Sequence, residues 1–148
     1  AVKYYPLGRR GFNTQLRSAH FGLKGSSLEY LKFANRETFV CVMIEDVEAV
    51  HNLGEILEVD GIDVYFVGPG DLSQSMGYPG QKDVPEVQSV VDRALDQIIQ
   101  AGKVAGVGAT DTDVPRYLAM GVKYFHASVT NLLRYGSQRY FQLSQGAR

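Results

Sequence analysis

Two acidic residues, Glu45 and Asp71, stand where hydrophobic segments of the chain run into loops. Glu45 closes the run FVCVMIE at 39–45, and Asp71 follows the run IDVYFV at 62–67 through a short glycine-rich link. They are 71 − 45 = 26 residues apart, about one strand–helix–strand repeat. If the two strands are parallel neighbours, both carboxylates emerge at the same edge of the sheet, where α/β folds place their active sites. A pair of hard oxygen ligands there is suited to a divalent cation such as Mg²⁺.

Acids that follow strands also serve as N-caps or first-turn residues of the next helix, where the helix dipole favours them. Position alone leaves both roles open for Glu45 and Asp71. Asp46, the neighbour of Glu45, is expected to cap the following helix. Asp63 precedes its strand, so we expect it at the opposite edge of the sheet.

The link between the second strand and Asp71 reads Gly68-Pro69-Gly70. It predicts a tight turn in which the backbone N–H groups of Gly70 and Asp71 can approach and hold a carboxylate. A plain turn without a ligand is the alternative interpretation.

Other polar residues are less informative. Arg9 and Arg10 could orient an anionic substrate, although loop arginines are more often solvated or at interfaces. His126 stands near the end of the fourth strand, where it either faces the site or belongs to the core or the rim. His20 and His51 have no clear partner, and no Ser-His-Asp order, zinc spacing or phosphate-binding loop occurs.

Hydrophobic periodicity predicts strands that alternate with helices. Val87, Val91, Leu95 and Ile98 belong to the clearest helical stripe, which begins after Pro85 and ends before Gly102. The expected order is a loop at 6–27, a helix at 28–35, then strands at 39–45, 62–67, 103–108 and 122–128, with helices at 47–57, after 85, from Asp111 or Thr112 to Gly121, and at 131–143. This alternation predicts a parallel α/β sheet of four strand–helix units. Four units fit either half of an eight-stranded barrel or a small open sheet.

Composition narrows the class of protein. The 148 residues predict one domain, 1–148, and the net charge of −1 with a pI near 6.3 shows no electrostatic footprint for nucleic acid. The single cysteine, Cys41, fits a reduced compartment, and no apolar run is long enough to span a membrane. We therefore expect a cytoplasmic protein with no membrane or nucleic-acid partner. The chain begins at Ala1, which fits a processed protein or a piece of a longer one.

Together these segments resemble the HpcH/HpaI aldolases, a family of metal-dependent (class II) enzymes. The resemblance is carried by YPLGRRG at 5–11, by VMIE at 42–45 and above all by VGPGDLS at 67–73 with MGY at 76–78. It extends through PEV at 85–87, AGK at 101–103, RYL at 116–118 and LLR at 132–134, and so covers almost the whole chain.

The resemblance implies a TIM barrel that cleaves 4-hydroxy-2-oxo acids to pyruvate and an aldehyde. It implies that Glu45 and Asp71 are the protein ligands of Mg²⁺, Mn²⁺ or Co²⁺, and that the N–H groups of Gly70 and Asp71 hold the pyruvate carboxylate. The metal then acts as a Lewis acid that stabilises the pyruvate enolate. Gly108 replaces a bulky apolar residue that lines the aldehyde side of the pocket. Smaller departures are Met43, where many members have glutamine, and Gly70, where alanine is frequent.

The match covers only about the last three-fifths of the family's barrel. The histidine that serves as acid or base and the substrate-contacting arginine of the family have no counterpart here, so no catalytic acid or base is assigned. Two alternatives to an aldolase stay open: a non-catalytic fragment that binds a metal and a 2-oxo acid, and an oxaloacetate decarboxylase or CoA-thioester lyase of the same superfamily. A half-barrel also exposes two sheet edges and an apolar face, so we expect self-association into a homo-oligomer.

Overall fold

The computed structural model describes residues 1–145. Internal contacts divide the chain into two compact units, Ala1–Val40 and Cys41–Arg148. Within the described part of the chain, none of the helices has the length and apolar character needed to cross a membrane.

The first unit consists of loops, the 3-10 helix η1 (Arg17–Gly22) and the helix α1 (Ser27–Glu37). A capping box begins α1, because the Ser26 hydroxyl accepts from the Glu29 N–H while Glu29 accepts from the Ser26 N–H. The Asn35 side chain ties the N-terminal loop to this helix, since its Oδ1 accepts from the Tyr4 N–H at 2.7 Å. The loop at 6–27 with a short helical turn and the helix near 28–35 are thus confirmed.

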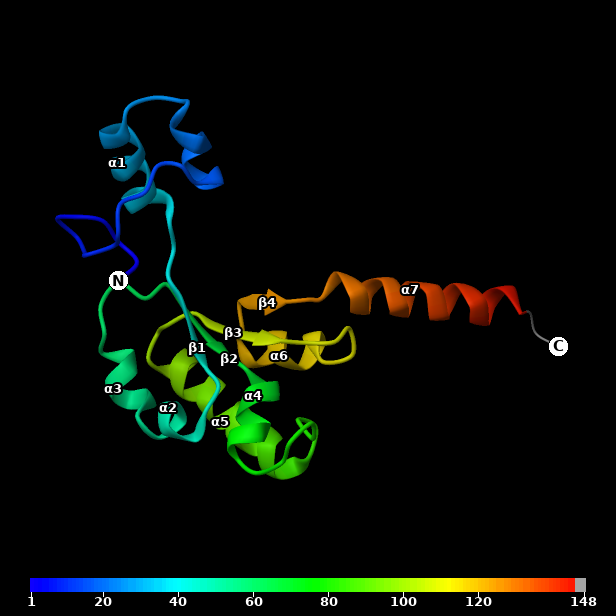
Figure 1. Cartoon of the computed structure of the whole chain (residues 1–148). Coiled ribbons are helices and arrows are strands. Elements are labelled where there is room, and N and C mark those ends of the chain that lie inside the picture. Colours follow the sequence, from blue (N-terminus) through cyan, green and yellow to red (C-terminus); the bar gives the residue numbers. More distant parts are fainter. Residues whose placement is uncertain (146–148) are drawn as a thin grey trace. The chain divides into compact units, whose positions relative to one another are not determined.

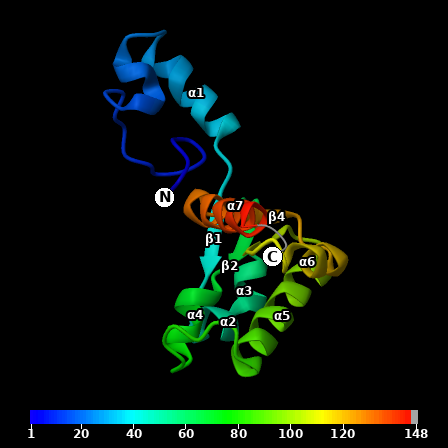
Figure 2. The same cartoon turned by 90° about the vertical axis from the view of Figure 1, so that its right-hand side faces the viewer.

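The second unit is a four-stranded parallel sheet whose strands follow the chain in the order β1-β2-β3-β4. Its elements are β1 (Cys41–Ile44), α2 (Val47–His51), α3 (Leu53–Leu57), β2 (Val64–Val67), α4 (Pro69–Ser75), α5 (Pro85–Gln100), β3 (Ala105–Gly108), α6 (Val114–Met120), β4 (Tyr124–His126) and α7 (Val129–Ser144). Figures 1 and 2 show α2, α3, α5 and α6 on one side of this sheet. The predicted α/β class with four strand–helix units is confirmed.

Alternation along each strand separates the two faces of the sheet. One face, the covered face, carries the fully buried side chains of Ile44, Tyr65, Val67 and Val107, which pack in one hydrophobic cluster with the buried stripe of α5. The other, the open face, carries the buried Val64 beside Cys41, and otherwise exposed or half-buried side chains, namely Cys41, Met43, Phe66, Tyr124 and His126. The register that aligns the faces pairs Met43 with Phe66, Phe66 with Gly106, and Gly106 with Tyr124.

Several local predictions are confirmed by the helix ends. The Asp46 carboxylate accepts from the Ala49 N–H at 2.7 Å and so caps α2. Pro85 occupies the first turn of α5. Gly121 ends α6 with φ +101°, a left-handed conformation that favours glycine.

Besides strands that are shorter than expected, three elements differ from the sequence prediction. The single helix expected at 47–57 is broken at Asn52 into α2 and α3. The helix that Asp111 or Thr112 is expected to cap begins only after Asp113, because Asp113 is held in a turn by Thr110. The glycine-rich link at 68–71 is not a free-standing tight turn: Pro69, with its φ already near the helical value, is the first residue of α4.

Candidate functional site

Glu45 lies at the carboxyl edge of the sheet, directly after β1 and against the residue that follows β2. A Cβ placed on Gly68 would lie 3.0 Å from the Glu45 Cβ and 3.3 Å from the Glu45 Oε2. The Gly68 N–H donates to the Ile44 carbonyl at 3.0 Å, which holds the two chain segments together. Glycine at 68 therefore leaves the space that the Glu45 side chain occupies, and the half-buried carboxylate lies beside the start of α4.

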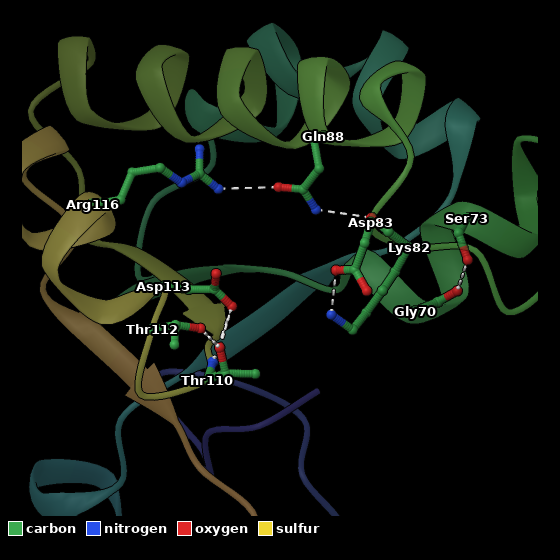
Figure 3. Close-up of polar contacts among 9 residues, drawn as sticks. All are labelled: Gly70, Ser73, Lys82, Asp83, Gln88, Thr110, Thr112, Asp113 and Arg116. Atoms are coloured by element: carbon green, nitrogen blue, oxygen red, sulfur yellow. Dashed lines mark hydrogen bonds and ion pairs between the residues drawn. The ribbon is translucent and has the colours of Figure 1, made fainter.

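The first turn of α4 presents backbone N–H groups at this same edge. Gly68 is the N-cap residue and has no side chain with which to cap the helix. N–H groups in a first helical turn have no carbonyl partner within the helix, which leaves those of Gly70 and Asp71 available to another acceptor. The Ser73 hydroxyl, fully buried, donates to the Gly70 carbonyl at 2.6 Å and stabilises this turn (Figure 3).

Asp71 is an exposed residue in the first turn of α4. Because β1 and β2 are parallel neighbours, Glu45 and Asp71 both follow the carboxyl ends of their strands and occupy one edge, as the spacing predicts. Among residues 1–145, no group of three or more His, Cys, Asp or Glu side chains is arranged to hold a metal. Two carboxylates fit a hard divalent cation that takes its other ligands from water and substrate, so the donor set is compatible with the expected metal.

The segments of the chain differ in charge. Between Thr38 and Gln81 the chain carries eight acidic residues and no Lys or Arg. Residues 1–37 have the opposite balance, with seven Lys or Arg and two Glu. The segment that carries Glu45 and Asp71 is therefore acidic, although its acids lie at both edges of the sheet, with Asp63 at the amino edge.

The open face continues from this edge as an apolar hollow. A cavity of about 280 Å³ is lined by Cys41, Met43, Phe66, Tyr124 and His126. Met43 links the hollow to the edge, because its Cε lies 3.6 Å from the position of a Cβ on Gly68. Gly108 borders the hollow, and a Cβ there would make ordinary contact with the Phe66 Cζ at 3.8 Å.

His126 was left between a site, core or rim position by the sequence, and the structure places it at the rim. It is the last residue of β4, is exposed, and its ring meets the Phe66 ring edge-on with centroids 6.3 Å apart. The importance of Gly68 and Phe66 was missed by the sequence analysis. Met43 and Glu45 alternate along one strand, and Phe66 and Gly68 alternate along the next, so each pair could have been expected to share a face. Only the pairing of β1 with β2 shows that both pairs lie on the same face of the sheet.

Hydrogen bonds hold the loops around this edge (Figure 3). The Thr110 hydroxyl donates to the Asp113 Oδ2 at 2.6 Å, and this bond is the main reason that the pKa of Asp113 is lowered. Arg116 donates to both carboxylate oxygens of Asp92 at 2.8 Å and to the Gln88 side chain at 3.0 Å. These contacts join α5 to α6 and so stabilise the scaffold behind the site.

The remaining predicted candidates belong to both units of the chain. Arg10 stacks over the Tyr4 ring at 4.7 Å within the first unit, which also contains Arg9 and His20. His51 is an exposed residue in the last turn of α2. Asp63 directly precedes β2, at the amino edge of the sheet, as expected.

Comparison with known proteins gives one consistent result. The family model for HpcH/HpaI aldolase/citrate lyase matches residues 1–132. A 4-hydroxy-2-oxo-heptane-1,7-dioate aldolase of Salmonella typhimurium is 41% identical over 140 residues, which are 93% of this chain and 52% of that protein. The chain thus spans about half the length of the curated relatives it matches.

Solved structures agree with this match. An HpcH/HpaI aldolase/citrate lyase family protein from Burkholderia cenocepacia superposes with a TM-score of 0.80 at 29% identity, covering 98% of this chain and 58% of that one. The citrate synthase SbnG superposes with a TM-score of 0.71 at 30% identity, covering 97% of this chain and 55% of that one.

Proposed function

The chain belongs to the HpcH/HpaI aldolase/citrate lyase family, and on this basis we propose that it is the metal- and pyruvate-binding half of a class II aldolase. The reaction is the cleavage of a 4-hydroxy-2-oxo acid to pyruvate and an aldehyde. The observation that supports the proposal best is that the Glu45 carboxylate lies against Gly68, the N-cap residue of α4, which has no side chain to cap the helix. The whole segment 1–148 is then one partial domain of this family.

In this proposal Glu45 and Asp71 hold a divalent cation, Mg²⁺ or Mn²⁺, with Co²⁺ a further candidate. The cation, when bound, supplies Lewis-acid stabilisation for the negative charge that develops on the 2-oxo oxygen as the C3–C4 bond breaks. The N–H groups of Gly70 and Asp71 orient the substrate carboxylate. Gly108 lies on the side of the pocket toward the aldehyde, and no residue of this chain is assigned as acid or base.

The exposed parts of the sheet also support association of this chain with a second chain. The strands β1 and β4 are the two edges of the sheet, and the open face carries Met43 with 52% exposure. Unpaired edges and exposed apolar faces favour pairing with another sheet. We therefore propose a homo-oligomer, while the cytoplasmic location stays a prediction from the sequence alone.

The test is a calorimetric titration of the chain with Mn²⁺, with and without pyruvate. We expect Mn²⁺ to bind, pyruvate to strengthen this binding, and Asp71→Asn or Glu45→Gln to weaken it at least tenfold because each removes one anionic ligand. Glu55→Gln is the matched control, since Glu55 is an exposed glutamate on α3. A folded chain that does not bind Mn²⁺, or equal losses in Glu45→Gln and Glu55→Gln, would contradict the proposal.

A turnover assay separates the three possibilities that share this site. Cleavage of a 4-hydroxy-2-oxo acid that EDTA abolishes would identify an active aldolase. Binding of Mn²⁺ and pyruvate without turnover would identify a non-catalytic fragment, which the lack of an assigned acid or base favours. Faster decarboxylation of oxaloacetate than aldol cleavage would favour the remaining alternative, an oxaloacetate decarboxylase or CoA-thioester lyase of the same superfamily.

A further inference from the structure

The first turn of α2 takes a hydrogen-bond acceptor from a different element. The hydroxyl oxygen of Ser75, the last residue of α4, accepts from the Val47 N–H at 3.0 Å, although the two residues are 28 positions apart in the sequence. An N–H group in the first turn of a helix has no carbonyl partner within that helix. The Asp46 carboxylate caps α2 by accepting from Ala49, so Ser75 provides the acceptor for Val47. This contact joins the end of α4 to the start of α2.

The contact is the second of two ties between the segments that carry Glu45 and Asp71. The first is at the start of α4, where the Gly68 N–H donates to the Ile44 carbonyl at 3.0 Å. Glu45 directly follows the first tie and stands two residues before the second, and Asp71 lies between the two ties on α4. Each backbone is therefore held on both sides of the carboxylate that it carries.

We propose that Ser75 is a positioning residue that fixes the spacing between Glu45 and Asp71, and that the site thereby prefers a small divalent cation to a large one. The inference rests on the proposed function, in which these two carboxylates hold the cation. Ser75 acts through its hydrogen bond with Val47 and is not itself a ligand.

The two tied segments differ in how firmly side-chain packing holds them. The helix α4 is anchored by the buried side chains of Pro69, Leu72 and Ser73. None of residues 47–51, which make up α2, is buried. Packing therefore fixes the start of α2 less firmly than it fixes α4, and the Ser75 hydroxyl holds the less firmly packed segment to the better anchored one.

The chemistry of divalent cations connects this spacing with selectivity. Mg²⁺ requires nearly ideal octahedral geometry with metal–oxygen distances of about 2.0 to 2.1 Å, whereas Ca²⁺ accepts flexible geometry at about 2.3 to 2.6 Å. Two carboxylates on separate segments meet the stricter requirement only if the segments do not move relative to each other. Loss of the Ser75 acceptor should therefore weaken the binding of Mg²⁺ more than that of Ca²⁺.

The test measures competition of two cations for the site. Mg²⁺ or Ca²⁺ displaces Mn²⁺ in a calorimetric titration, which gives the affinity for each competitor. We expect Ser75→Ala to lower the affinity for Mg²⁺ about tenfold and that for Ca²⁺ by less than about twofold. Ser75→Thr, which keeps a hydroxyl oxygen at this position, should restore the preference of the original chain. Ser89→Ala is the matched control, since Ser89 is an exposed serine on α5.

Hydrogen exchange tests the contact itself in the metal-free chain. The Val47 amide proton should exchange faster in Ser75→Ala than in the original chain or in Ser75→Thr, because it loses its acceptor. An unchanged exchange rate, an equal loss of affinity for both cations in Ser75→Ala, or failure of Ser75→Thr to restore the preference would overturn this inference alone. An original chain that does not bind Mn²⁺ would overturn the proposed function together with it.

Discussion

The two faces of the sheet are built from the same four strands but have opposite properties. Ile44 and Met43 are adjacent in β1, yet Ile44 is 1% exposed on the covered face and Met43 is 52% exposed on the open face. The covered face packs Val67 and Val107 against the apolar stripe of α5. The open face instead combines aromatic rings with two glycines of β3, Gly106 and Gly108.

The difference teaches where stability and where function are located in this chain. Burial of apolar side chains is the main contribution to folding, so the covered face must carry most of the stability of the second unit. The open face contributes less, and it adjoins both Glu45 and the start of α4. The glycines weaken packing there but leave the room that a ligand requires.

The largest expected effect comes from truncating neighbours on opposite faces of β1. Ile44→Ala should lower the free energy of unfolding by about 3 kcal/mol, because it leaves a cavity in the core. Met43→Ala should lower it by less than about 1 kcal/mol, because that side chain is half in solvent. Urea unfolding followed by circular dichroism measures both, with Ile44→Val as an intermediate control. Equal losses for the two alanine variants would show that the open face is covered in solution, as it would be in a homo-oligomer.

A smaller effect is expected from filling the glycines of the open face. A Cβ on Gly106 would lie 2.9 Å from the Tyr124 Cδ1 and 3.2 Å from the Phe66 Cδ2. Gly106→Ala must therefore displace a ring, and we expect a loss of about 1 to 2 kcal/mol in unfolding free energy. Gly108→Ala, whose nearest contact is the ordinary 3.8 Å, should stay within about 0.5 kcal/mol of the original chain. If the two variants unfold at the same urea concentration, the rings do not pack over β3 as described.

The smallest expected effect concerns the thiol of Cys41, which reports whether the open face is accessible to solvent. Cys41 is exposed at the start of β1 on the open face, and partial burial raises the pKa of its thiol. We expect a thiol-specific reagent to label it without denaturant, more slowly at neutral pH than a free cysteine, because the raised pKa lowers the thiolate fraction. The rate should rise with pH beyond the range in which ordinary thiols ionise. Complete protection in native buffer, relieved only by urea, would mean that a second chain covers this face.

Local sequence signals predicted most of the elements. The stripe of α5, with Pro85 and Gly102 at its ends, needed only helical periodicity, and the Asp46 cap needed only its position before Val47. The predicted helix starts were wrong where a side-chain contact, or a residue type common to turns and helices, outweighs the hydrophobic pattern. The hydrogen bond from Thr110 to Asp113 holds a turn there, so α6 starts later in the chain than predicted. The link from Gly68 to Asp71 was predicted as a turn because glycine and proline are typical of turns as well as of helix starts.

The order of the strands and of most helices, the parallel sheet and the position of Glu45 and Asp71 after two of its strands could be predicted from the sequence, because these follow from periodicity and chain direction. The helix α4 and the break between α2 and α3 could not. The contact of Glu45 with Gly68 and the pairing of Gly108 with His126 depend on how the strands pack together in three dimensions. These neighbours belong to different strands, and the register between strands is set by the packing of the covered face, since a slip of one residue would turn its buried side chains outward. No local sequence pattern near His126 indicates which residue of β3 will lie beside it in the sheet.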